Sequence, residues 1–317
     1  MVEQFVVGVD VGGQTSKIGV VNAAGEILSQ SVIRSDVYGS DADAFLSALA
    51  DAIKANIDDS GKEGQIKGVG VGAPNANYYT GTVSYAPNLA WAADKEVKFA
   101  EELSAKLGGI PVTLTNDANA AAVGEMTYGV AQNLKHFIMI TLGTGVCSGI
   151  IVNGQLLYGH DGFAGELGHT KVQENGRLCG CGGKGCLEAY CSATGVARTA
   201  REILDTTEEP SLLRSLDNIT SKDVYDAAKE GDAVAMKIFD FTARLLGKSL
   251  ANFVSFSSPQ AIVLFGGLAR AKEFLYEPMM EAMNENLLHQ WKGKIQILFS
   301  SLKESDAAIL GASSLAW

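Results

Sequence analysis

One arrangement of strands and glycine turns occurs twice in this chain of 317 residues. An apolar strand at 5–10 leads into the turn Gly12-Gly13, a strand at 17–21, a tight turn and a strand at 26–33. About 130 residues later the order returns as strand 137–142, glycine turn 143–145, strand 148–152, the hairpin signal Asn153-Gly154 and strand 155–158. The repeat predicts a duplicated domain. Two facing hairpins would form a cleft whose walls present backbone N–H groups, which bind anions and above all phosphates.

Between and after the repeats, helical and strand patterns alternate, which favours an α/β class with partly parallel sheets. The patterns predict helices at 41–57, 94–107, 118–128, 233–254, 272–289 and 305–315, and further strands at 66–71, 112–115, 261–265 and 295–299.

Three glycine turns follow apolar strands, and these are Gly12-Gly13, Gly143-Thr144-Gly145 and Gly266-Gly267. None has the Gly-Lys-Ser/Thr of a Walker A loop, and the first two lead into strands where a dinucleotide fingerprint needs a helix. A single such turn is as easily an ordinary tight turn. Three of them in a duplicated topology favour a phosphate site. Asp10, beside the first turn, is suited to holding Mg²⁺ against phosphates, or else it caps the turn.

Three cysteines lie within eight positions, at Cys179, Cys181 and Cys186, and His169 lies ten residues upstream. Thiolates and an imidazole on a glycine-bent loop suit tetrahedral Zn²⁺, and four protein ligands would make the site structural. A disulfide with a spare thiol is the alternative. Cys179 and Cys181 are too close in sequence for an easy bridge. The N-terminus shows no signal peptide, so we expect a cytoplasmic protein, where disulfides are rare.

The charge and hydropathy of the chain exclude two classes of partner. The formal net charge is −11, which argues against nucleic acid, because phosphate binding depends on Lys and Arg. No apolar run reaches the length of a membrane span.

Several of these motifs together resemble those of the ROK-family sugar kinases, which share the actin/hexokinase ATPase fold. The segments that carry the resemblance are 10–17, 116–125, 142–145, the run Gly165-Glu-Leu-Gly-His169 and the run from Cys179 to Glu188. The resemblance implies a two-domain fold with an interdomain cleft. It places a smaller domain at 1–116 plus the C-terminal helix at about 303–317, and a larger, zinc-bearing domain at 117–302.

The resemblance also implies roles for single residues. Asp117 is the expected general base that accepts the proton of the sugar hydroxyl. At a helix start it also suits a plain N-cap, and the macrodipole would stabilise its anion. The expected sugar ligands are Asn88, Asn116, Asp117, Glu166, His169 and Glu188. The expected ATP-binding residues are Asp10, Gly12, Gly13, Gln14, Gly143, Thr144, Gly145, Gly266 and Gly267, with Mg²⁺ at Asp10.

The expected activity is ATP-dependent phosphorylation of a hexose at its 6-hydroxyl, with glucose as the first choice. The alternatives are a kinase for N-acetylmannosamine, fructose or another hexose, or a non-catalytic sugar-binding regulator. The chain departs from the family pattern at Gln14, Asn75 and Cys147-Ser148. The changes at Gln14 and Cys147-Ser148 touch phosphate loops, and Asn75 touches the sugar wall. The resemblance further favours a homodimer or homotetramer.

Overall fold

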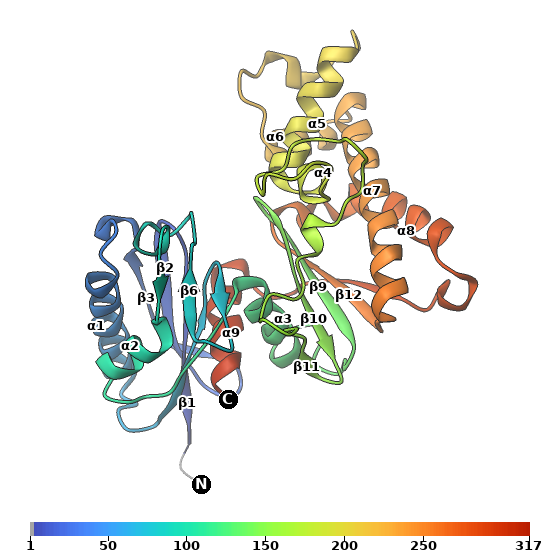
Figure 1. Ribbon diagram of the computed structural model, residues 1–317. Helices are drawn as coiled ribbons and strands as arrows, with labels where there is room; N and C mark the ends of the chain where they lie inside the picture. The colour runs from blue at the N-terminus through green and yellow to red at the C-terminus, as the bar shows by residue number, and fades with distance from the viewer. Residues whose placement is uncertain (1–2) are drawn as a thin grey trace. The chain divides into compact units, whose positions relative to one another are not determined.

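The computed structural model describes residues 3–317, and its first sheet carries the first copy of the repeat (Figure 1). The strand order is β3-β2-β1-β4-β8. β1 pairs antiparallel with β2 and parallel with β4, β2 pairs antiparallel with β3, and β4 pairs parallel with β8. The strands are β1 (Phe5–Val11), β2 (Thr15–Val21), β3 (Ile27–Arg34), β4 (Ile66–Gly72) and β8 (Val112–Thr115).

Helices cover both faces of this sheet. α1 (Ala42–Ser60) and α2 (Phe99–Lys106) pack on one face, where Val7 and Val9 of β1 join the main core. α9 (Glu304–Ser313) and α3 (Asp117–Thr127) cover the other face. α9 lies very close to the strands, since a Cβ on Gly8 would stand 2.1 Å from the carbonyl oxygen of Ile309. Glycine is therefore required at that position of β1.

The second sheet has the corresponding order, β11-β10-β9-β12-β13, so the predicted duplication is confirmed. β9 pairs parallel with β12, and β12 pairs parallel with β13. Its strands are β9 (Phe137–Leu142), β10 (Val146–Val152), β11 (Gln155–Leu156), β12 (Ala261–Phe265) and β13 (Gln296–Phe299). Asn153 and Gly154 connect β10 to β11 with φ of 53° and 73°, which is the two-residue hairpin turn that the dipeptide predicts.

The helices of the second half of the chain are α4 (Glu188–Cys191), α5 (Ala193–Thr206), α6 (Ser221–Lys229), α7 (Ala233–Ser257) and α8 (Lys272–Asn286). The two longest of them, α7 and α8, pack side by side (Figure 1). Within the described chain, no helix is both long enough and apolar enough to cross a bilayer.

One predicted helix is wrong in its first part. Residues 94–98 do not begin the helix expected at 94–107, because β7 (Glu96–Val97) pairs there with β6 (Thr82–Ser84). β5 (Ala76–Asn77) completes this small three-stranded sheet. The side chain of Val97 is buried opposite Val83. Pairing with a strand from another part of the chain therefore makes this residue extended, although the local pattern predicted helix.

Contacts divide the chain into two units. Unit 1 comprises residues 1–135, 149–164 and 300–317, and unit 2 comprises residues 136–148 and 165–299. The division of the family fold into domains at 1–116 with 303–317 and at 117–302 stays a prediction.

Candidate functional site

In unit 2, the four predicted metal ligands converge. The ligand atoms of His169, Cys179, Cys181 and Cys186 all lie within 4.8 Å of one another. The Sγ atoms of Cys181 and Cys186 are 3.7 Å apart, and Nδ1 of His169 lies 3.8 Å from Sγ of Cys179. Zinc with thiolates at about 2.3 Å in a tetrahedron requires S···S separations of about 3.8 Å. The donor set therefore fits zinc, and all five cysteines of the chain are free thiols, which argues against the disulfide alternative.

The cysteine loop is fixed by its own backbone and by one arginine. Lys171 and Cys186 form an antiparallel bridge, as do Leu178 and Lys184. The guanidinium of Arg177 donates to the carboxylate of Glu202 and to the carbonyl oxygens of Ala189 and Gly195. Its charge also lies 4.4 Å from the centre of the Tyr190 ring. Arg177 thus ties the loop to α4 and α5. No sequence motif marks this arginine, since its partners lie 12 to 25 residues away.

Two predicted sugar ligands lie beside the cysteine loop. Glu188 is the first residue of α4, and its carboxylate accepts the backbone N–H of Val146 at 3.0 Å. The other oxygen accepts the thiol of Cys179 at 3.3 Å. Glu188 lines a cavity of about 190 Å³ together with Thr194 and Arg198. Nε2 of His169 points toward the exposed side chain of Glu166, at 3.8 Å from Oε2.

Both glycine turns of unit 2 lie at the carboxyl end of the parallel pair β9–β12. Gly266 has a φ of 98°, and a Cβ there would stand 2.7 Å from the carbonyl oxygen of Leu142. A Cβ added to Gly143 or Gly267 would meet no atom within 4 Å, so the backbone of both is open on that side. The hydroxyl of Thr194 donates to the carbonyl oxygen of Thr144 and holds the second turn against α5. Open glycine backbone is what an anion cradle requires.

In unit 1, the end of β8 presents Asn116, a predicted sugar ligand, and Asp117, the predicted general base. Asn116 is the N-cap of α3, because its side chain accepts the backbone N–H of Asn119 at 2.7 Å. The capping alternative for Asp117 is therefore wrong, since Asp117 is the first residue inside the helix. Its carboxylate accepts the N–H of Ala118 at 2.9 Å and keeps access to solvent. Desolvation by the protein atoms around it raises the pKa of Asp117, opposing the helix dipole and that hydrogen bond.

Asp10 lies at the same edge of the first sheet. It pairs across β1 and β4 with Gly72, and a Cβ on Gly72 would stand 3.6 Å from Cα of Asp117. Burial, followed by the negative charge of Asp117, raises the pKa of Asp10 to about 6, while Lys17 acts in the opposite direction. Two neighbouring carboxylates with raised pKa values are suited to a divalent cation or to proton transfer.

The first glycine turn meets the loop that holds Asn88. A Cβ on Gly13 would stand 2.5 Å from the carbonyl oxygen of Asn88, and the side chain of Asn88 is exposed. Gly12 donates its N–H to Thr15, and the carbonyl oxygen of Gln14 accepts the N–H of Ser35. The Gln14 side chain itself is exposed, so this departure from the family pattern does not disturb the turn.

The other departures have structural roles. Asn75 has a φ of 54°, a left-handed conformation that glycine usually supplies and asparagine tolerates, and its amide donates to the carbonyl oxygen of Tyr85 at 2.9 Å. The hydroxyl of Ser148 donates to the carbonyl oxygen of Gly165, next to Glu166.

A tyrosine cluster beside the end of β8 carries no sequence signal either. The ring of Tyr158 stacks on Tyr78 with centroids 4.0 Å apart, and the hydroxyl of Tyr79 donates to the carbonyl oxygen of Gly159 at 2.9 Å. Burial raises the pKa of Tyr158 to about 12, although a hydrogen bond between its side chain and that of Thr115 acts to lower it. No motif marks these residues, because β8 and the loop after β11 meet only in the fold.

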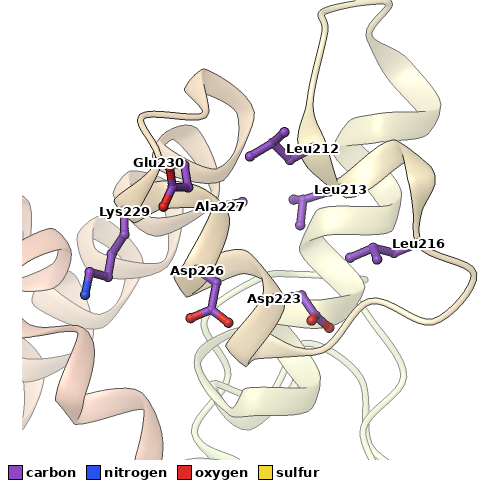
Figure 2. Close-up of a pocket in the computed structure, with 8 residues that line it drawn as sticks. All are labelled: Leu212, Leu213, Leu216, Asp223, Asp226, Ala227, Lys229 and Glu230. Atoms are coloured by element: carbon purple, nitrogen blue, oxygen red, sulfur yellow. The ribbon is translucent and has the colours of Figure 1, made fainter.

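A larger cavity, of about 390 Å³, lies elsewhere in unit 2 (Figure 2). Three leucines face the acidic side chains of α6 across it. The lining residues are Leu212, Leu213, Leu216, Asp223, Asp226, Ala227, Lys229 and Glu230. Asp223 is held by the cap at Thr220 and Asp226 by Lys222, so these two carboxylates already have partners. None of the predicted site residues lines this cavity.

Comparisons with known proteins agree with the motifs. The ROK family model matches residues 6–317. A glucokinase of Halalkalibacterium halodurans is 37% identical over 322 residues, covering 99% of this chain and 96% of that protein. The crystal structure of a ROK hexokinase from Thermus thermophilus superimposes with a TM-score of 0.84 at 29% identity, covering 98% and 97% of the two chains.

A ROK family glucokinase from Streptomyces griseus, solved with glucose and AMPPNP, has a TM-score of 0.77 at 34% identity, covering 98% of both chains. These structural neighbours have the actin-like ATPase fold, so the predicted fold class is confirmed. With its sequence matched from end to end and its fold shared, this chain belongs to the ROK family.

Proposed function

We propose that this protein is a glucokinase, which transfers the γ-phosphoryl group of ATP to the 6-hydroxyl of glucose. The coarser statement, an ATP-dependent hexose kinase, rests on family membership and on full-length similarity to glucokinases. The observation that carries the mechanism is the pair of carboxylates at one edge of the first sheet, Asp10 and Asp117.

In the proposed reaction, Asp117 is the general base. The sugar hydroxyl oxygen attacks the γ-phosphorus, the bond to the β–γ bridging oxygen breaks, and the hydroxyl proton passes to the Asp117 carboxylate. The carboxylate is held in place by the N–H of Ala118 yet open to solvent, which suits a group that must meet a substrate. Its raised pKa makes it a stronger base than an ordinary aspartate.

The phosphates and the metal ion would be held by backbone and by Asp10. Gly12, Gly13, Gln14, Gly143, Thr144, Gly145, Gly266 and Gly267 are the proposed ATP-binding residues. Support comes from the open backbone at Gly143 and Gly267. Asp10 would hold Mg²⁺, whose charge offsets that of the phosphates.

Sugar recognition is assigned to Asn88, Asn116, Asp117, Glu166, His169 and Glu188. Carboxylates accept hydrogen bonds from paired sugar hydroxyls, and amides both accept from hydroxyls and donate to them. Zinc on His169 and the three cysteines would fix the loop that presents Glu166 and Glu188. The metal would then act structurally, and the phosphoryl chemistry would not involve it.

A hexose panel in a coupled ADP-release assay tests this proposal. We expect glucose to give the highest kcat/KM, with N-acetylmannosamine, fructose and mannose well below it. ADP release at background with every hexose, alongside calorimetric sugar binding, would instead identify a non-catalytic regulator. We further propose that the protein is cytoplasmic and forms a homodimer or homotetramer. Analytical ultracentrifugation would measure its oligomeric state.

A further inference from the structure

One charged side chain at the cysteine cluster has no part in the proposed site. Nζ of Lys171 donates to Sγ of Cys186 at 2.9 Å. Lys171 and Cys186 are direct partners in an antiparallel bridge, so their side chains share one face. Backbone bonds fix the register on both sides, from Val172 to Gly185 at 2.8 Å and from Leu187 to Thr170 at 3.0 Å. The lysine is therefore placed beside the thiol by the fold.

The ammonium also lies against the turn between the other cysteines. A Cβ on Gly183 would stand 2.6 Å from Nζ of Lys171, 3.5 Å from Sγ of Cys181 and 3.7 Å from Sγ of Cys186. The three atoms thus surround a common point over Gly183. A side chain at position 183 would take the space of the ammonium, whose flexible end can move away.

The net charge of the zinc site explains why an ammonium beside Cys186 would favour metal binding. Zn²⁺ with three thiolates and a neutral imidazole carries a net charge of −1. One ammonium cancels it, and a charge-assisted bond to a thiolate is stronger than a neutral one. A lysine held at the sulfur lowers the cost of gathering three thiolates around one ion.

We propose that Lys171 is the charge-balancing residue of the zinc site, and that it sets the affinity for the metal through its bond to Cys186. This inference rests on zinc binding by the cysteine loop and not on which sugar is phosphorylated. Removing an outer partner of a metal ligand typically costs about 10–100-fold in metal affinity.

The test measures zinc affinity of the whole protein by competition with a chromophoric chelator, using Zn²⁺ alone as the probe. We expect Lys171→Gln to weaken zinc binding about 10–100-fold. Lys171→Arg, which keeps the positive charge, should have a zinc affinity closer to that of the wild-type protein. Lys184→Gln is the matched control, because it removes the same charge from the same loop without a bond to sulfur, and it should change affinity less than about twofold. The Lys171→Gln deficit should shrink at about 1 M salt, because the ammonium is exposed.

Gly183→Ala supplies an independent arm. The substitution keeps the lysine but displaces its ammonium, so on its own it should weaken zinc binding. Added to Lys171→Gln, it should change zinc affinity little further, because the ammonium is already gone. Equal affinities for wild type, Lys171→Gln and Lys184→Gln would overturn the proposal, as would equal losses in the two glutamine variants. A wild-type protein that binds no zinc would overturn it as well, while glucose phosphorylation, assayed separately, would leave the proposed function standing. Circular dichroism of each variant confirms that it is folded.

Discussion

Replacing Asp117 by asparagine tests the proposed base most directly. Asparagine keeps the shape of the side chain and an oxygen that can accept the N–H of Ala118, which the carboxylate accepts at 2.9 Å. The cap of α3 is supplied by Asn116 and is untouched. The variant should therefore fold, and it loses only the group that accepts the proton. Loss of a general base costs about 10²–10⁴ in kcat, or about 2.7–5.4 kcal/mol of transition-state stabilisation.

The structure supplies a second readout. The charge of Asp117 is one cause of the raised pKa of Asp10, after burial. Removing that charge should lower the pKa of Asp10 from about 6, while burial keeps it above the usual value of 3.8. A carboxyl titration followed by NMR would detect this change whether or not the variant is active.

The assay is steady-state ADP release with glucose and ATP, alongside calorimetric glucose binding, with Asp59→Asn on α1 as an exposed control. We expect kcat to collapse for Asp117→Asn while glucose binding stays measurable. A kcat within about fivefold of wild type would refute Asp117 as the base. An unchanged Asp10 pKa would refute the electrostatic effect of Asp117 on Asp10.

The remaining predictions concern Asp10, two of the glycine turns and the cysteine loop. Asp10→Asn should abolish activity. It should also stabilise the fold by up to about 3 kcal/mol at pH near 7.5, because the pKa of the Asp10 carboxyl rises from 3.8 in the unfolded chain to about 6 in the folded one. Such a carboxyl destabilises the folded state increasingly as pH rises through that window, and asparagine removes this effect. Urea unfolding should show this gain vanish at pH near 3.5, and a gain independent of pH would contradict it. Gly13→Ala should cost about 1–3 kcal/mol in urea unfolding, since its Cβ meets Asn88 at 2.5 Å, whereas Gly143→Ala should cost less than about 1 kcal/mol. Cys181→Ser should lower the zinc content, the melting temperature and glucose affinity together, and full zinc occupancy in that variant would contradict the ligand set.

Local patterns predicted the two sheets well. β1 and β9 are continuous apolar runs that end in glycine turns, because each is the central strand of its sheet and is buried on both faces. The hairpin at Asn153 follows from the backbone preference of two residues. The strand pairing of Val97 did not follow, because its partner Val83 lies in another segment of the chain and a local pattern does not show which segments pair.

The candidate site divides in the same way. The cysteine spacing predicted a group of thiols that, with His169, lie close enough together to hold a metal ion, since thiol chemistry and glycine turns are local properties. Lys171 and Arg177 were not found, because a lysine or arginine in a loop carries no mark of which sulfur or carbonyl it will meet.

The sequence by itself determined the duplicated α/β fold, the family and the grouping of His169 with the three cysteines, since strand periodicity, turn chemistry and residue type are properties of neighbouring positions. Only the tertiary structure decided that burial and the charge of Asp117 raise the pKa of Asp10. It also decided that Asn116 caps the helix and that Lys171 faces Cys186. These are properties of distance and burial, and the folded chain alone brings together groups that are far apart in sequence.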